Sequence, residues 1–147
     1  MTIPFPAVAA AIRKTLEGQG FTRLLGAEVV SVEPGVVVMA LDRRDEVLQQ
    51  NGLFHGGAIA YLVDNATTAA AATVIDRDKR TVITAEYKIN LVAPSRGDRL
   101  TCCAEVVKPG RSLTVVEAKV FCRTGGEEKL VAVALATIAN LDVSKTA

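Results

Sequence analysis

Apolar residues are densest between Gly57 and the polar cluster at 76–80, in an Ala-rich segment without Pro or Gly. Because Ala is the best helix former, this segment predicts a helix of roughly 18 residues, about 27 Å long. Its faces are apolar nearly all round, which is typical of a buried helix. Asp64 lies in its middle, and a buried carboxylate is costly unless it is paired or has a chemical role.

The segments on either side of this helix have different patterns. Residues 6–17 place Val8, Ala9, Ile12 and Leu16 on one face and end at Gly18, which predicts a short amphipathic helix. Residues 26–41 predict two strands around a Glu-Pro-Gly turn at 33–35, followed by a polar connection at 43–50. After the helix, turn signals separate four predicted strands, at 81–92, 100–107, 112–123 and 129–141.

Two strands, one long helix and four strands predict an α+β domain that spans residues 1–147. A six-stranded antiparallel sheet can wrap around a single apolar helix, with the short N-terminal helix outside. A helix that is apolar nearly all round needs more cover than one sheet gives. We therefore expect at least a dimer.

Composition limits the partners. The chain is 50% hydrophobic and carries 17 basic and 16 acidic side chains, so its net charge of +1 disfavours nucleic-acid binding. No apolar run approaches the roughly 18 residues of a membrane span, and the N-terminus lacks the order of a signal peptide, so we expect a cytoplasmic protein. An odd number of cysteines argues against a disulfide framework, and a single histidine argues against a metal site.

The candidate chemistry lies where the long helix begins. Gly56 and Gly57 follow His55, and glycine at a helix N-terminus lets a ligand approach unpaired N–H groups that suit an oxyanion. Asp64 lies about 10 Å further along the helix, which is too far for both to act on one atom unless the substrate enters between two subunits. The alternative is that these residues have only a structural role. The glycines would then only make a turn, and the carboxylate of Asp64 would be hydrogen-bonded by Thr68 or Tyr61.

The spacing of His55-Gly56-Gly57 and Asp64 resembles the signature of hotdog-fold acyl-CoA thioesterases, in particular the phenylacetate-degradation (PaaI-like) branch. Further similarity lies in the entry strand at 25–29, the Glu-Pro-Gly turn, the Asn51-Gly52 lead-in, the Ala-Pro and Gly-Asp pairs at 93–98, and the turn at 110–112. The similarity covers roughly residues 22–141, the expected domain core, and leaves 142–147 as a loose tail.

This resemblance implies an assembly and a set of catalytic roles. In the family, two protomers join their sheets edge to edge, dimers pair into homotetramers, and the active site lies at the subunit interface. The Gly56 N–H would bind the thioester oxygen of an acyl-CoA. Asp64 would act as general base or nucleophile, and His55 would orient the thioester. Such hydrolysis needs no metal and no cofactor, since coenzyme A is part of the substrate.

The resemblance also implies supporting residues. Gln49 occupies a position where the family often has a water-placing Asn, and Asn51 is a possible substitute for it. Thr84 matches a small hydroxyl residue that holds the water. Further residues are expected to contact the substrate or its CoA moiety: Tyr61, Thr68, Lys88, Asn90, Gly110, Arg111 and Ser112.

Two alternatives remain open. One is an acyl dehydratase of the same fold, although its His lies in a different local pattern. The other is a non-catalytic sensor that binds acyl-CoA, although such a protein usually lacks the acid. The acyl group is not specified, but small residues such as Ala58, Ala60 and Ala66 suggest room for a medium-chain or aromatic group.

Overall fold

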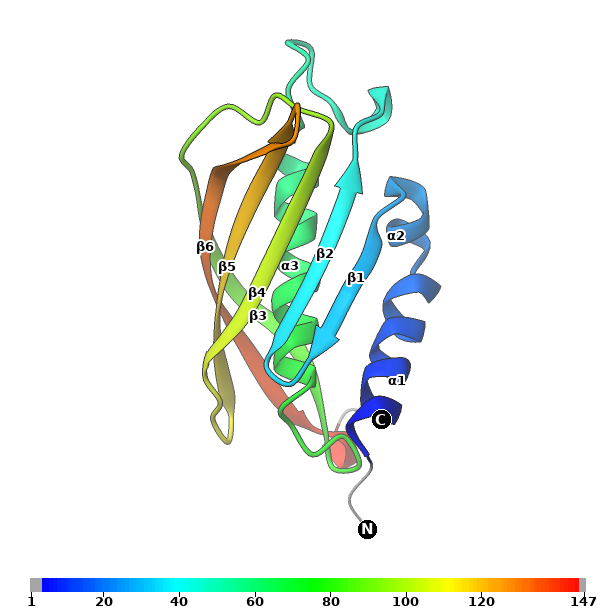
Figure 1. The fold of residues 1–147 in the computed structure, drawn as a ribbon. Helices are drawn as coiled ribbons and strands as arrows, with labels where there is room; N and C mark the ends of the chain where they lie inside the picture. The colour runs from blue at the N-terminus through cyan, green and yellow to red at the C-terminus, as the bar shows by residue number, and fades with distance from the viewer. Residues whose placement is uncertain (1–3, 146–147) are drawn as a thin grey trace.

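The computed structural model describes residues 4–145, which form one antiparallel sheet, one long helix and several short elements (Figure 1). In chain order the elements are α1 (Phe5–Gly18), α2 (Gly20–Leu25), β1 (Glu28–Glu33), β2 (Val36–Asp42), η1 (Asp45–Val47), α3 (Gly56–Ala72), β3 (Arg80–Leu91), β4 (Arg99–Lys108), β5 (Leu113–Thr124), β6 (Glu127–Asp142) and η2 (Val143–Lys145).

The sheet has the strand order β1-β2-β4-β5-β6-β3, with antiparallel neighbours throughout, and it curves around α3 (Figure 1). Helix α3 packs against β2, β3, β4, β5 and β6, and 11 of its 17 residues are buried. The predicted hotdog architecture, with six strands wrapped around one apolar helix, is confirmed. The core combines aliphatic side chains of the sheet with the Ala-rich face of α3.

Helix α3 ends at Ala72, four residues before the polar cluster that the sequence suggested as its limit. Thr73 forms the C-cap, and its hydroxyl donates to the carbonyl of Ala70 at 2.6 Å. The same hydroxyl accepts the N–H of Gly35 in the β1–β2 turn at 2.7 Å. This contact anchors the end of the helix to the sheet.

The N-terminal region contains more helix than its sequence predicted. Helix α1 is confirmed, and Ile12 and Leu16 are its buried residues. Helix α2 was not predicted, because its six residues are too few to show a periodic pattern. It ends at Gly26, whose φ of 71° is the left-handed C-cap conformation that glycine favours.

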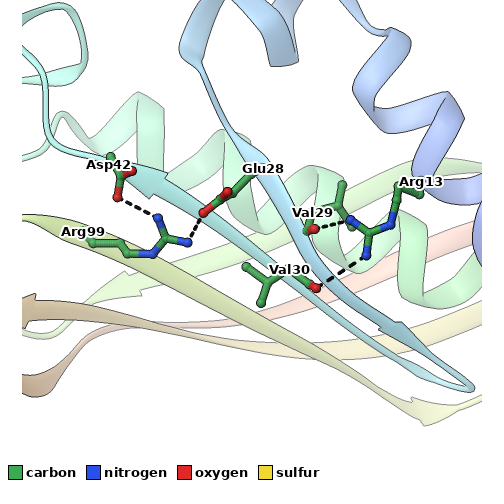
Figure 2. A network of polar contacts seen from close by, with 6 residues as sticks. All are labelled: Arg13, Glu28, Val29, Val30, Asp42 and Arg99. Carbon is green, nitrogen blue, oxygen red and sulfur yellow. Dashed lines mark hydrogen bonds and ion pairs between the residues drawn. The ribbon is translucent and has the colours of Figure 1, made fainter.

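Two arginines attach the outer elements to the sheet (Figure 2). Arg99 of β4 donates to Asp42 of β2 at 2.7 Å and to Glu28 of β1. The hydrogen bonds that Arg99 donates to Asp42 and to Glu28 raise the pKa of its guanidinium despite its partial burial. Arg13 of α1 donates to the carbonyls of Val29 and Val30 in β1. The edge strand β1 is therefore bound on both sides.

The C-terminal segment contains further structure within the described residues. Asp142 still pairs with Arg80 at the end of β6, and Val143–Lys145 forms a 3-10 turn. The N–H of Val143 donates to the carbonyl of Lys79 at 3.0 Å. The prediction missed this because three residues carry too little pattern. Residues 146 and 147 lie outside the described part.

Strand β3 is the second edge of the sheet, since within residues 4–145 it pairs with β6 alone. It leaves large apolar side chains exposed: Ile83 is 55% exposed and Leu91 61%. A long apolar edge of this kind is a template for pairing with another strand.

Candidate active site

The His55-Gly56-Gly57 turn forms the N-terminus of α3. His55 is the N-cap, and its Nδ1 accepts the N–H of Gly57 at 2.8 Å. The acceptor role of Nδ1 means that a neutral His55 carries its proton on Nε2, which is thus a hydrogen-bond donor. Among residues 4–145, the N–H of Gly56 has no hydrogen-bond partner. One free backbone donor and one imidazole donor therefore lie together at the positive end of the helix dipole.

Asp64 lies at the β3 side of α3, at the end of a chain of hydroxyl groups. Thr84 of β3 donates to Asp64 Oδ1 at 2.6 Å. Thr68 and Thr84 are linked through their hydroxyl oxygens at 2.7 Å. Since Thr84 has one proton and gives it to the carboxylate, Thr68 is the donor of the second bond. The chain orients Asp64 and leaves its Oδ2 without a hydrogen-bond partner within the described residues.

The partners of Asp64 were only partly predicted. Thr68 acts through Thr84 and does not contact the carboxylate directly. The hydroxyl of Tyr61 instead donates to Thr22 of α2 at 2.6 Å, and its ring packs edge-on against Phe21. Sequence reasoning missed this because α2 itself was not predicted.

The contact of Tyr61 belongs to a second polar cluster between α2 and α3. Thr22 donates to Gln19 Oε1 at 3.1 Å, and Asn65 Nδ2 donates to the same oxygen at 2.9 Å. This cluster fixes Asn65, the residue after Asp64, and so helps to hold the middle of α3 in place.

Gln49 lies close to the glycine turn. With Gly56, Ile59 and the end of β3 it lines a hollow of about 430 Å³. Its Oε1 accepts the N–H of Asn51, which leaves its amide NH2 as a donor. Asn51 is exposed, and its carbonyl accepts from Arg96 at 3.3 Å. Of the two expected water-placing residues, Gln49 is the one that lines this hollow.

A larger cavity of about 550 Å³ lies between α1, the C-terminal half of α3 and the start of β3. Thr68 and Asn65 line it, so it begins beside Asp64, while Arg77 and Arg80 line its other part. No sequence pattern predicted this cavity, because its walls come from three separate parts of the chain.

The residues expected to bind coenzyme A lie in two places. Lys88 and Asn90 are exposed on β3, opposite Leu135 and Val133 of β6. Gly110, Arg111 and Ser112 form the β4–β5 turn, which is held by contacts to Asn140 and Arg80. Ser112 and Asn90 meet β6 about seven residues apart, or about 24 Å. One chain does not bring the two groups together.

The glycine turn and Asp64 are also separated within one chain. Gly56 and Asp64 are eight residues apart on the same helix, which is about 12 Å. No single reacting carbonyl contacts both. Gly56 instead lies beside the end of β3, since a side-chain carbon built there would meet Leu91 Cδ1 at 3.8 Å.

The cysteines lie away from these groups. Cys102 is buried, and burial raises the pKa of its thiol to about 12, while Cys103 lies on the opposite face of β4. Among the described residues no group of His, Cys, Asp or Glu side chains has the arrangement of a metal site. Between residues 4 and 145, no helix combines the length and the apolar character needed to cross a membrane.

Comparison with known sequences shows the family to which the chain belongs. The thioesterase superfamily model matches residues 51–129, more than half of the chain. The 1,4-dihydroxy-2-naphthoyl-CoA hydrolase of Listeria monocytogenes is 34% identical over 120 residues, which cover 82% of this chain and 94% of that protein. Acyl-coenzyme A thioesterase 13 of Homo sapiens is 27% identical over 129 residues, covering 86% and 91%.

Solved structures agree in fold. A thioesterase family protein from Silicibacter pomeroyi superposes with a TM-score of 0.88 at 32% identity, over 95% of this chain and 99% of that one. The PaaI protein of the E. coli phenylacetic acid degradation operon gives a TM-score of 0.81 at 18% identity, over 94% and 96%. The expected family resemblance is confirmed.

Proposed function

Since the chain belongs to the thioesterase superfamily and is a thioester hydrolase of the acyl-CoA thioesterase type, we propose that Asp64 and Gly56 carry out its reaction. The observation that carries this proposal is the Thr68–Thr84–Asp64 hydrogen-bond chain, which fixes one carboxylate oxygen and leaves the other available.

In the proposed reaction, Asp64 takes a proton from water, and the resulting hydroxide attacks the thioester carbonyl carbon. The carbonyl oxygen becomes an oxyanion and accepts the N–H of Gly56, with the helix dipole as further stabilisation. The carbon–sulfur bond then breaks, and the thiolate of CoA takes the proton from Asp64. His55 Nε2–H and the Gln49 amide orient the thioester and the water. Direct attack by Asp64 is the alternative, through an anhydride that water hydrolyses.

Two chains together would form this site. Strand β3 is a 12-residue edge strand with exposed Ile83 and Leu91, and it suits antiparallel pairing with β3 of a second copy. Asp64 bonds to Thr84, while Gly56 lies beside Leu91. A two-fold axis between Tyr87 and Lys88 would set Thr84 opposite Leu91 of the partner subunit. The same pairing brings Gly56 of the partner subunit toward Asp64 and removes the 12 Å separation.

The same two-fold axis would join the two groups expected to bind coenzyme A. It sets Ala85 opposite Asn90 of the partner subunit, close to the strand position where the β4–β5 turn meets β6 and β3. The CoA moiety would then lie across the β3–β3 seam, between Arg111 and Ser112 of one chain and Lys88 and Asn90 of the other. We further propose that such dimers pair into a homotetramer in the cytoplasm.

The test is free-thiol release from a panel of acyl-CoAs by three proteins. Asp64→Asn keeps the shape of the side chain and removes the base, so hydrolysis should fall at least a hundredfold while the assembly remains intact. Gly56→Ala places a methyl group beside the oxyanion position, where its nearest protein neighbour is an ordinary contact, so activity should fall with little change in stability.

Two outcomes contradict the proposal. If Asp64→Asn hydrolysed acyl-CoAs at the wild-type rate, Asp64 would not be the general base. If that variant unfolded, a structural role for Asp64 would be favoured. No turnover of any thioester, combined with tight binding of the intact acyl-CoA, would favour the sensor function. Light scattering of the wild type then tests the dimer and tetramer.

A further inference from the structure

The cavity of about 550 Å³ follows α3 away from Asp64. Asn65, Thr68 and Ala72 line it in turn, over about 10 Å of helix, and Arg77 lines it in the loop that follows. It begins at the hydroxyl of Thr68, which reaches Asp64 through Thr84. Its volume falls within the range of pockets for small organic ligands.

Half of the side chains that line this cavity are apolar. Ile12 and Leu16 of α1 face Ala69 and Ala72 of α3 across it, and Val82 of β3 contributes a third side. This apolar part suits a hydrocarbon chain and offers no partner to the strongly hydrated diphosphate of coenzyme A. The cavity is therefore matched to the acyl part of a thioester whose carbonyl lies at Asp64.

The remote part of the cavity is cationic. Arg77 is half-buried there, and within residues 4–145 its guanidinium makes no hydrogen bond or ion pair. Its neighbour Asp76 is occupied by Lys79 at 3.0 Å. Arg80 also lines the cavity, but its guanidinium donates to the carbonyl of Arg111. Arg77 is thus a free planar donor, which matches a carboxylate in two-point contact.

We propose that the substrate carries an anionic group, a carboxylate, at the end of its acyl chain remote from the thioester, and that Arg77 binds it. This inference rests on the proposed function, because that function places the thioester at Asp64. Arg77 is then a specificity-determining residue. An acyl-CoA with a terminal methyl group would leave the guanidinium half-buried and unpaired, which is the costly arrangement.

The test compares acyl-CoAs of equal chain length. Octanoyl-CoA and decanoyl-CoA are measured beside their ω-carboxylate counterparts, with wild type, Arg77→Met and the control Lys14→Met. Lys14 is exposed on α1, does not line the cavity and loses the same charge. The wild type and the control should prefer the ω-carboxylates in kcat/KM by about tenfold or more, which is about 1.4 kcal/mol. Arg77→Met should lose this preference, and it should hydrolyse the neutral esters at least as fast as the wild type, because no unpaired guanidinium remains in the cavity.

Other results overturn the proposal in distinguishable ways. In one such result, the wild type hydrolyses the neutral esters as fast as the ω-carboxylates, and both rates are lost in Asp64→Asn. That result would refute the anionic group on the substrate and leave the proposed thioesterase mechanism intact. Weaker binding of free CoA by Arg77→Met, measured by calorimetry, assigns Arg77 to a CoA phosphate instead. If no ester is hydrolysed, calorimetry of the same four esters still decides: equal affinities overturn the proposal, and tighter ω-carboxylate binding that is lost in Arg77→Met supports it.

Discussion

Replacing Thr84 by Val tests whether the hydroxyl chain prepares Asp64 for catalysis. Valine has nearly the shape of threonine, and β3 accepts a β-branched residue at this position. The substitution removes the donor to Asp64 Oδ1 and leaves Thr68 without its acceptor. The carboxylate then stays at the same place on α3 but loses the hydrogen bond that fixes its orientation.

The expected size follows from the geometry. A contact of 2.6 Å between a hydroxyl and a carboxylate is in the range of charge-assisted hydrogen bonds, which contribute about 1.5 to 3 kcal/mol. If that energy is needed in the transition state, kcat/KM should fall about tenfold to a hundredfold. Thr68→Val removes only the outer, neutral bond of about 1 kcal/mol, so its loss should be a few-fold.

The assay is thiol release under conditions where kcat and KM separate, with urea unfolding of each variant alongside. Thr84→Ser keeps the hydroxyl and should recover most of the activity. The free energy of unfolding should fall by no more than about 3 kcal/mol in Thr84→Val, the upper value for the lost hydrogen bond, because the site is only partly buried. Unchanged kcat/KM in Thr84→Val would falsify the positioning role, and equal losses of activity in Thr84→Ser and Thr84→Val would assign the effect to packing.

Three further predictions concern stability. Arg99→Met should cost about 1 kcal/mol in urea unfolding, since both carboxylate partners are more than half exposed; a loss above 3 kcal/mol would contradict this. Burial raises the pKa of Cys102 from 9.0 to about 12, so its stabilising effect is complete below pH 9 and is lost as the pH rises toward 12. Thermal unfolding across that range should show the decline, and Cys102→Ala should flatten it. Gly97→Ala should cost about 2 kcal/mol or more, since its new carbon would lie 2.1 Å from a carbonyl oxygen, whereas Gly18→Ala, with nothing within 4 Å, should change stability by less than about 0.5 kcal/mol on calorimetry.

Local patterns were sufficient to predict most of the fold. The Ala-rich segment predicted α3, and turn signals predicted the six strands to within one or two residues, because helix and strand periods are properties of short stretches. The same holds for the glycine turn, since His55, Gly56 and Gly57 are adjacent and their N-cap geometry needs no distant partner. The short elements α2 and η2 were not predicted, because they contain too few residues to show a helical period.

The partners of each site residue depended on the tertiary structure. Asp64 meets Thr84, twenty residues away, because β3 runs back along α3 in one register, and sequence alone does not determine that register. Tyr61 was expected near the substrate, yet its hydroxyl bonds to α2, an element without a sequence signal. The cavity ending at Arg77 has walls from three segments, and only packing brings them together.

The sequence by itself therefore determined which long elements form, which residue types stand at the start and middle of the central helix, and which family the chain resembles. Those features are set by nearest neighbours along the chain. The tertiary structure alone decided that one oxygen of Asp64 is held and the other is unpartnered, that β3 is an exposed apolar edge, and that an unpaired guanidinium lines the cavity beside Asp64. These features depend on contacts between segments that are distant in sequence, whose geometry is fixed only when the sheet closes around the helix.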